Sequence, residues 1–410
     1  MWTVLRRYQG VAYEPTQIPG SDAGKKATPQ SGRTSGRRSG GSLDAFTVNQ
    51  RTLFLHQNRP SPPPDDPNIL TAPYGAWIYS KLLAAAAYPE NSNPVMRRQA
   101  LSMLLDAYAQ KTEHVVLSLR DGAAVALAQC LKDPDEEVRT QACVALELIV
   151  MHPSGQAQCL EDKLLPAFLE ALSDHSCHVA TEALRLCASG HAAHNDMLMT
   201  KELVRLGAVA KYVALASSPD DSVCAAALAA LSKVFDVKEA SIAVLDHDGM
   251  KPLTVAVSSR TDPQVLIEAA ECIGRLAFFS AGKRAAVHER TVEPIVKLIT
   301  HADTIVRTAA SGALVALTVS EAGKAQAIES GVVPTIVSAI QSEDERDVLI
   351  NDVKTICNLA EHPVARLQLH AVIPRLEEMS AMAAAEHPTL VRNVELCVRL
   401  LKWQPGEVRC

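Results

Sequence analysis

One apolar position returns at nearly regular intervals along the chain, and this period constrains the fold more than any other feature. The residues at this position, here called the anchors, are separated by 42, 41, 44, 42, 41, 42 and 42 residues: Met96, Val138, Val179, Val223, Val265, Val306, Val348 and Leu390. The residues four positions later, here called the +4 residues, are Ala100, Ala142, Ala183, Ala227, Ala269, Ala310, Asp352 and Val394. A period near 42 predicts a solenoid, in which each repeat buries its apolar faces against its neighbours.

The segment 306–340 predicts that each repeat contains three helices. Its first part has apolar residues at the spacing of one helical face, namely Val306, Ala310, Ala313, Leu314 and Leu317. Ser320 can then cap a short helix that begins at Glu321, because its hydroxyl can accept a hydrogen bond from a free backbone N–H. Gly331 ends that helix, since glycine enters the left-handed region without a steric penalty. Pro334 then fits the first turn of a third helix.

The marks before the third helix recur in the other repeats. Glycine occupies the break at Gly122, Gly207, Gly249 and Gly331, and proline begins the helix at Pro166, Pro252, Pro294, Pro334 and Pro374. We therefore predict an all-α, armadillo/HEAT-type, right-handed superhelical solenoid over residues 67–405. Its repeats are expected at 93–132, 133–174, 175–218, 219–261, 262–302, 303–344 and 345–385, with capping helices at 73–87 and 388–402.

Residues 1–66 differ in composition from the rest of the chain. They are rich in Gly, Ser, Arg and Pro and have no apolar period, so we expect a disordered or extended N-terminal arm. Arg33, Arg37 and Arg38 give this arm a basic cluster that would dock on an acidic surface. The alternative interpretation is a solvated linker, which is the commoner role of such a segment.

The composition argues against several classes of function. Aromatic residues make up 4% of the chain, which is typical of closely packed helices rich in small residues. A net charge of −6 argues against a general nucleic-acid binder. The sequence contains no run of 18 consecutive apolar residues, so no membrane-spanning helix is expected. The ten cysteines contain no CxxC pair and lie mostly in apolar segments, which indicates reduced core thiols rather than a disulfide framework or a metal site.

The helix that carries the anchors lines the concave groove in armadillo proteins. Nuclear-import receptors of this fold have Trp six positions and Asn ten positions after the anchor, and this ladder grips extended peptides. No Trp occurs at the first position here, and Asn occurs once at the second, so import-cargo binding is not expected. Our candidates for a partner-binding groove are the charged and amide residues on this helix, namely Lys233, Glu271, Arg275, Lys354 and Asn358.

Enzymatic interpretations find little support in the sequence. The AGK motifs at 281–283 and 322–324 lie outside a GxxxxGK[ST] phosphate loop. Asp246, His247 and Asp248 resemble a ligand cluster, but they lie between two predicted helices, where such residues usually serve as caps and turns. We expect no catalytic residue, cofactor, metal or small-molecule substrate.

Asp352 is unusual because it occupies a +4 position that is apolar in the other repeats. A carboxylate at this position should be either half exposed or paired. Lys354 and Arg375 are its expected partners.

Motifs at both ends of the solenoid resemble one family. The segments DPNILTAPYGAWIYSKLL, MRRQALSMLLDAYA and LRDGAAVALAQCLKDPDEEVRTQA are similar to the opening of the radial spoke protein 14 family, an armadillo-type component of motile cilia. The segments ASGALVALTVSEAGKAQAIESG, LQLHAVIPRLEEM and VRLLKWQP resemble that family too. The resemblance runs from Asp66 to Pro405 and depends on the order of the motifs, and the first 65 residues depart from it.

The resemblance implies a non-catalytic scaffold in the radial spokes of the axoneme, which join the outer doublet microtubules to the central pair. Its partners would be other radial spoke proteins and the surface of the doublet microtubule. Its location would be the cytoplasm, the cytoskeleton and the axoneme of the cilium or flagellum. The alternative function is a cytosolic adaptor that binds a peptide of a signalling or trafficking partner in its groove.

Overall fold

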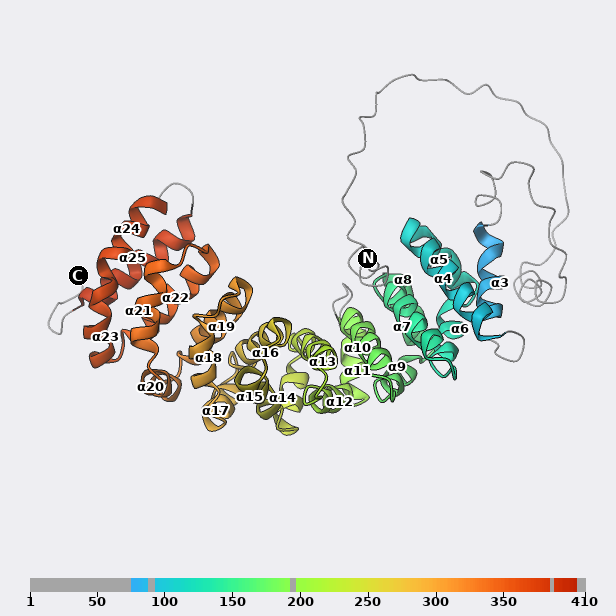
Figure 1. The fold of residues 1–410 in the computed structure, drawn as a ribbon, viewed down its shortest axis with the longest axis horizontal. Coiled ribbons are helices and arrows are strands. Elements are labelled where there is room, and N and C mark those ends of the chain that lie inside the picture. Colours follow the sequence, from blue (N-terminus) through green and yellow to red (C-terminus); the bar gives the residue numbers. More distant parts are fainter. Residues whose placement is uncertain (1–74, 88–92, 192–196, 384–386, 404–410) are drawn as a thin grey trace, which may run out of the picture. The chain divides into compact units, whose positions relative to one another are not determined.

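The computed structural model describes residues 75–87, 93–191, 197–383 and 387–403. These residues are almost entirely helical, and the described part of the chain contains no strand (Figure 1). The chain divides into two compact units, residues 1–164 and 165–410, which are considered separately. The predicted arm at 1–66, with Arg33, Arg37 and Arg38, lies outside the described residues.

The described helices of the first unit are α3 (Gly75–Ala87), α4 (Pro94–Gln110), α5 (Thr112–Arg120), α6 (Ala123–Cys130), α7 (Glu136–Val150) and α8 (Pro153–Glu161). Helix α3 is the capping helix predicted at 73–87, and it packs against α4 and α6. Helices α4 and α7 carry anchors and pack against each other. The short helices α5 and α6 complete the first repeat.

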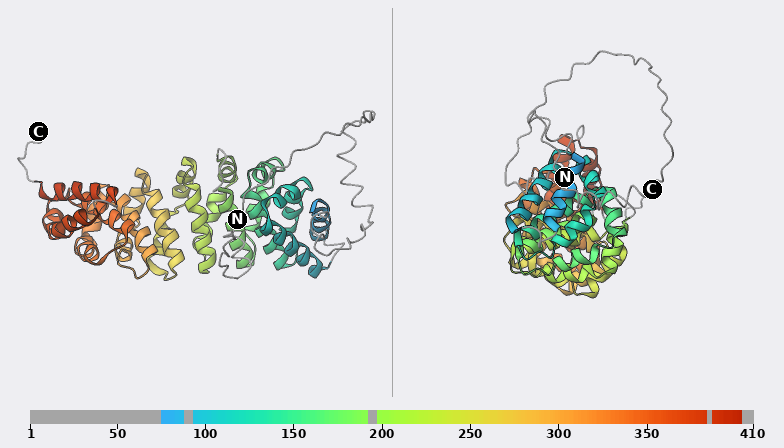
Figure 2. Two further views of the ribbon diagram at one scale, coloured as in Figure 1. Left: turned by 90° about the horizontal axis from the view of Figure 1, so that it is seen from above. Right: turned by 90° about the vertical axis from the view of Figure 1, so that its right-hand side faces the viewer.

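The second unit repeats the same pattern of one long and two shorter helices. Its helices are α9 (Leu165–Ala171), α10 (Cys177–His191), α11 (Leu198–Arg205), α12 (Ala208–Leu215), α13 (Asp221–Val234), α14 (Lys238–Asp246), α15 (Met250–Ser259), α16 (Pro263–Leu276), α17 (Ser280–His288), α18 (Val292–Leu298), α19 (Thr304–Leu317), α20 (Glu321–Glu329), α21 (Val332–Ser342), α22 (Arg346–Leu359), α23 (Pro363–Leu369), η3 (His370–Val372), α24 (Ile373–Ala383) and α25 (Pro388–Lys402). The long helices α10, α13, α16, α19, α22 and α25 each pack against the next and form one continuous stack (Figure 2).

The long helices begin where the sequence supplies an acceptor for their free N–H groups. In the second unit Asp220, Asp262 and Asp303 precede α13, α16 and α19, and each side chain accepts a hydrogen bond from a backbone N–H of the first turn. The short helix α20 begins at Glu321 after Ser320, whose hydroxyl accepts from the Gly323 N–H at 3.2 Å. These caps hold the start of each helix in register.

The anchor pattern predicted the packed positions correctly except in the first repeat. All eight +4 residues are buried, and so are seven of the eight anchors. Met96 is 51% exposed, which corrects its assignment as a buried anchor. The buried place in this turn of α4 belongs to Arg97, whose guanidinium contacts both carboxylate oxygens of Asp133 at 2.8 and 2.9 Å.

The predicted glycine break is present at three positions and absent at a fourth. Gly122, Gly207 and Gly331 have φ angles of 84°, 86° and 79°, in the left-handed region. Gly249 is right-handed helical, and Asp248 takes the left-handed position with a φ of 53°. Glycine is needed at 249 for another reason, because a Cβ there would lie 2.4 Å from Cγ1 of Val244.

Glycine also permits the close approach of the short and long helices within a repeat. A Cβ at Gly282 would lie 2.0 Å from the carbonyl oxygen of Leu276, and one at Gly323 would lie 2.1 Å from that of Leu317. Both glycines belong to the AGK motifs, so these motifs have a packing role in the structure.

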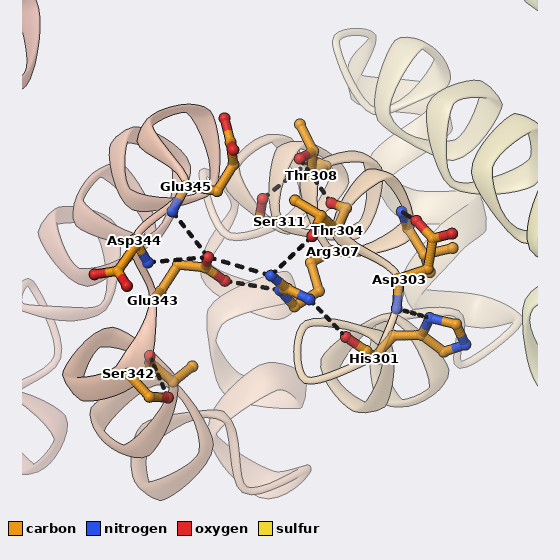
Figure 3. Close-up of polar contacts among 12 residues, drawn as sticks. His301, Asp303, Thr304, Arg307, Thr308, Ser311, Ser342, Glu343, Asp344 and Glu345 are labelled. Carbon is orange, nitrogen blue, oxygen red and sulfur yellow. Dashed lines mark hydrogen bonds and ion pairs between the residues drawn. The ribbon is translucent and has the colours of Figure 1, made fainter.

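An ion pair within the repeat 303–344 joins its long helix α19 to the segment that follows α21 (Figure 3). Arg307 of α19 contacts Glu343 through Nε–Oε2 at 2.7 Å and Nη2–Oε1 at 3.2 Å, and its Nη1 donates to the carbonyl oxygen of His301 at 3.0 Å. Glu343 also accepts from the backbone N–H of Glu345 at 3.0 Å. Burial alone would raise the pKa of Glu343, but the hydrogen bonds from Arg307 and the backbone outweigh it and lower that pKa. The pair therefore fixes the segment between α21 and α22 against α19.

The substitution Ala310→Asp should destabilise the second unit. Ala310 is fully buried, so the new carboxylate would lose its hydration within the stack. We expect the free energy of unfolding to fall by about 3–5 kcal/mol, measured by chemical denaturation. The matched control is Ala325→Asp on α20, where the alanine is exposed and the loss should be small. Equal stability of the two variants would contradict the packing register.

Candidate protein-binding site

Three of the predicted groove residues lie on the adjacent long helices α13 and α16. Lys233 is in the last turn of α13, and Glu271 and Arg275 are on α16. Lys233 and Glu271 are exposed, and Arg275 is half-buried. Since α13 packs against α16, these residues share a mixed-charge surface. We call it the α13–α16 face and include in it Asp236 and Glu268, which are described next.

Glu268 is a member of this face that the sequence analysis missed. It lies three residues before Glu271 on α16 and is half-buried, and its Oε1 accepts from Nε2 of Gln264 at 2.8 Å. Burial and the negative charge of Glu271 raise the pKa of Glu268, while Gln264 and Lys233 act in the opposite direction. The face thus contains a carboxylate that is partly removed from water and lies near a second carboxylate.

Arg275 is braced against the preceding repeat. Its Nη1 donates to the carbonyl oxygen of Ser232 at 2.9 Å and lies 3.3 Å from Oδ1 of Asp236. The guanidinium therefore caps the C-terminal end of α13, where unpaired carbonyl groups carry partial negative charge. Asp236, 64% exposed at its side chain, is the second residue of this face that the sequence analysis missed.

Lys354 and Asn358 lie on α22, which is separated from α16 by α19. Lys354 is exposed, whereas Asn358 is half-buried. Nδ2 of Asn358 donates to the carbonyl oxygen of Val315 at 3.1 Å and to Oγ1 of Thr318 at 3.1 Å. The amide nitrogen of Asn358 therefore forms hydrogen bonds that connect α22 to α19. In the same way, Arg275 connects α16 to α13. The structure groups Lys233, Glu271 and Arg275 and places the other two candidates elsewhere.

Two exposed apolar side chains follow the ends of the long helices α16 and α19. Phe278 is 78% exposed and follows the last turn of α16, while Val319 is 57% exposed at the equivalent place after α19. Their shared offset of thirteen residues from the anchors Val265 and Val306 was the signal available in the sequence. Phe278 comes three residues after Arg275 of the α13–α16 face, and exposed aromatic side chains are enriched at the centres of protein contacts.

Asp352 is fully buried, and this overturns the expectation that it is half exposed or paired with Lys354 or Arg375. Neither of its carboxylate oxygens has a hydrogen-bond partner among the described residues. Burial raises the pKa of Asp352 to about 7, the charge of Glu343 adds to this rise, and Arg307 opposes it. Arg307 is already engaged with Glu343, so it does not form an ion pair with Asp352.

The Asp246–His247–Asp248 segment has the turn geometry that was predicted for it. Asp246 ends α14, His247 follows it, and Asp248 is left-handed. Among the described residues no group of three His, Cys, Asp or Glu side chains is placed to hold a metal ion. The same residues include no helix that is both long and apolar enough to span a membrane.

Comparison with solved structures identifies the fold. The crystal structure of an engineered protein matches 88% of this chain and 92% of its own length, with a TM-score of 0.69 and 20% sequence identity. A designed armadillo-repeat protein matches 58% of this chain and 99% of its own, with a TM-score of 0.52 and 20% identity. A further designed armadillo-repeat protein, in complex with the peptide (KR)4, matches 57% of this chain and 98% of its own, with a TM-score of 0.51 and 21% identity.

The sequence itself matches no protein-family model, and no curated protein matches it significantly. The likeness therefore concerns the fold. The predicted armadillo-type, all-α solenoid fold is confirmed.

The substitution Asp352→Ala should stabilise the second unit in a pH-dependent manner. Because the pKa of Asp352 rises from 3.8 to about 7 on folding, the carboxyl ionises more easily in the unfolded chain. The free energy of unfolding of the native protein therefore falls as the pH rises from 4 to 7. Above pH 7 the full loss applies, which is at most about 4 kcal/mol.

The measurement is the free energy of unfolding of both proteins at pH 5 and pH 8. We expect the gain from Asp352→Ala to be larger at pH 8. The control is Asp347→Ala on the same helix, where the carboxylate is exposed. A gain that does not change with pH would contradict the assignment of Asp352 as a buried carboxyl that ionises near neutrality.

Proposed function

We propose that this protein is a non-catalytic scaffold that holds a segment of a partner protein on its α13–α16 face. The observation that carries this proposal is the pairing and solvent exposure of Lys233, Glu268 and Glu271. Lys233 and Glu271 are exposed charges without an ion pair among the described residues, and Glu268 is partly removed from water. Such groups form favourable electrostatic interactions when a partner of complementary charge binds. The packed helices beneath them keep their positions fixed.

The chemistry of the face favours a partner segment with both charge and an apolar side chain. A Lys or Arg of the partner would satisfy Glu268 and Glu271, and an acidic group would satisfy Lys233. Phe278 would contact the apolar side chain. The designed neighbour in complex with (KR)4 gives general support, because that protein has this fold and binds a charged peptide.

We further propose that the partner is another protein of the radial spoke and that the location is the axoneme of the cilium or flagellum. The support is the order of radial-spoke-like motifs from Asp66 to Pro405. In this setting Arg33, Arg37 and Arg38 would dock on an acidic neighbour or on the doublet microtubule. The fold suits a scaffold, since armadillo solenoids are typically binding proteins rather than enzymes.

A cytosolic adaptor that binds a signalling or trafficking peptide is the alternative proposal. It would use the same α13–α16 face, and the peptide-bound designed neighbour supports it equally. Detergent extraction separates the two proposals, because an axonemal scaffold stays with the axoneme and an adaptor is released.

The test of the radial-spoke proposal is the double substitution Lys233→Glu and Arg275→Glu. Both side chains lie outside the buried core, so helical content should be retained, although Arg275 loses its contact with Ser232. The variant should be expressed in ciliated cells that lack the native copy, and its retention on extracted axonemes measured at moderate salt. We expect lower retention and impaired beating, because reversed interface charges repel the partner.

Two controls make the result decisive. Lys251→Glu reverses an exposed charge on α15 and should leave retention unchanged. Lys233→Glu alone preserves the Arg275 brace and should also weaken retention. If the native protein is extracted completely, the axonemal location is wrong. If the native protein and both Lys233 variants remain bound and the cells beat normally, the α13–α16 face is not the interface.

A further inference from the structure

A groove lies between the end of α12 and the helix α15, and none of its lining residues belongs to the α13–α16 face. It has a volume of about 420 Å³. Its lining combines apolar side chains with a hydroxyl and two cationic groups, among them Ala216, Pro252, Ala256, Ser217, Lys251 and Arg260. No Asp or Glu is among the described residues that line it. The groove therefore has the charge of a site for an anion.

Arg260 fixes one wall of this groove. It follows the last turn of α15, and its Nη1 donates to the carbonyl oxygen of Pro219 at 2.9 Å. Its Nη2 donates to the carbonyl oxygen of Ser218, the residue that directly follows Ser217. The backbone beside Ser217 is thus bonded to the end of α15, which holds Ser217 at the edge of the groove.

The other two polar groups of the groove are accessible. Ser217 and Lys251 are both exposed. The Ser217 hydroxyl forms no hydrogen bond with another described residue, and the Lys251 ammonium forms no ion pair within the same ranges. A hydroxyl that can be modified and a cation without a counter-charge therefore line the same groove.

The sequence after Ser217 has the charge pattern of a kinase substrate. The segment 217–222 reads SSPDDS, so Asp220 and Asp221 follow Ser217 at the third and fourth positions. A protein kinase with a basic substrate groove selects such a serine by charge complementarity. Ser218 is less suited, because it is half-buried and its hydroxyl accepts from the Asp220 backbone N–H at 3.3 Å.

We propose that Ser217 is a phosphorylation site and that its phosphate binds Lys251 in the groove between α12 and α15. A phosphoserine carries nearly two negative charges at neutral pH and has three acceptor oxygens. The Lys251 ammonium would form charge-assisted hydrogen bonds with these oxygens. The inference is independent of the proposed partner and of the axonemal location.

The phosphoryl transfer is balanced by ATP, which the kinase supplies. The Ser217 Oγ attacks the γ-phosphorus of ATP, and its proton passes to the catalytic base of the kinase. The bond between the γ-phosphorus and the bridging oxygen breaks, so ADP leaves as a phosphoserine forms. No oxidation or reduction takes place.

The two carboxylates nearest in sequence are already engaged, which leaves Lys251 for the phosphate. Asp221 contacts Nη1 of Arg260 through Oδ1 at 2.6 Å. Asp220 caps α13, where its Oδ1 accepts from the backbone N–H groups of Ser222 and Val223 at 2.9 and 3.2 Å. The new contact would add a second link between the end of α12 and α15, beside the one that Arg260 provides.

The test begins with the full chain, casein kinase II as the acidophilic kinase, and magnesium ATP. Peptide mapping by mass spectrometry should place the phosphate on Ser217, and Ser217→Ala should remove it. Ser218→Ala is the matched control and should still be phosphorylated. A protein that takes up no phosphate, or takes it up on Ser218 or Ser222 instead of Ser217, would contradict the assignment of the site.

The contact with Lys251 is measured on protein that carries phosphoserine at position 217, introduced by the kinase or during translation. We expect the phosphorylated protein to unfold about 2–4 °C above the unmodified one, because the phosphate adds a link between two repeats. In ³¹P NMR the second pKa of the phosphate, about 6 in a free phosphoserine, should be lower in the native sequence than in Lys251→Ala, since a nearby cation favours the dianion.

Lys297→Ala is the matched control for this measurement. Lys297 is exposed on α18 in the next repeat and pairs with Glu293 at 2.9 Å. It should leave both the phosphate pKa and the gain in unfolding temperature unchanged, whereas Lys251→Ala should abolish both effects. Equal phosphate pKa values in the native sequence and in Lys251→Ala would overturn the proposal.

Discussion

The packing of consecutive long helices through small residues is the constraint on which the second unit depends. The +4 residues Ala183, Ala227, Ala269 and Ala310 are fully buried, and they recur at the interval of one repeat. Small side chains allow neighbouring helix axes to approach closely, and this approach sets which residues of each helix remain at the surface. Gly274 shows the same closeness, since a Cβ there would lie 3.3 Å from Cα of Ala313 on the next long helix.

Polar contacts between repeats follow from this packing. Arg275 and Asn358 occupy the tenth position after their anchors, and both donate to a backbone carbonyl 43 residues earlier, at Ser232 and Val315. Each contact ties the end of one long helix to the next. The exposed charges of the α13–α16 face thus stand on a surface whose helices are mutually braced, which reduces the entropy lost when a partner binds.

The repeat architecture could be predicted from the sequence because its signals are local and periodic. The short helix α20 begins at Glu321 after its Ser320 cap, and Gly331 is left-handed, as the single repeat 306–340 indicated. Its third helix carries Pro334 in its first turn. Because the anchors and the glycine and proline positions recur at the same interval, the period can be recognised even where a single repeat departs from it.

What the sequence did not reveal depends on contacts between repeats. Arg97 takes the buried place next to Met96 because Asp133, in the following repeat, supplies its partner. Asp352 is buried, and its carboxylate has no hydrogen-bond partner in the described part of the chain, although a sequence argument assigns any carboxylate at that position a partner.

The central claim is that a partner segment lies across the α13–α16 face. The most direct measurement is an electron cryomicroscopy map of this protein in complex with its native partner. We expect density of a second chain against Glu268, Glu271 and Phe278, with a basic side chain of the partner near the two carboxylates. A map in which these residues face solvent while the partner contacts other helices would contradict the account.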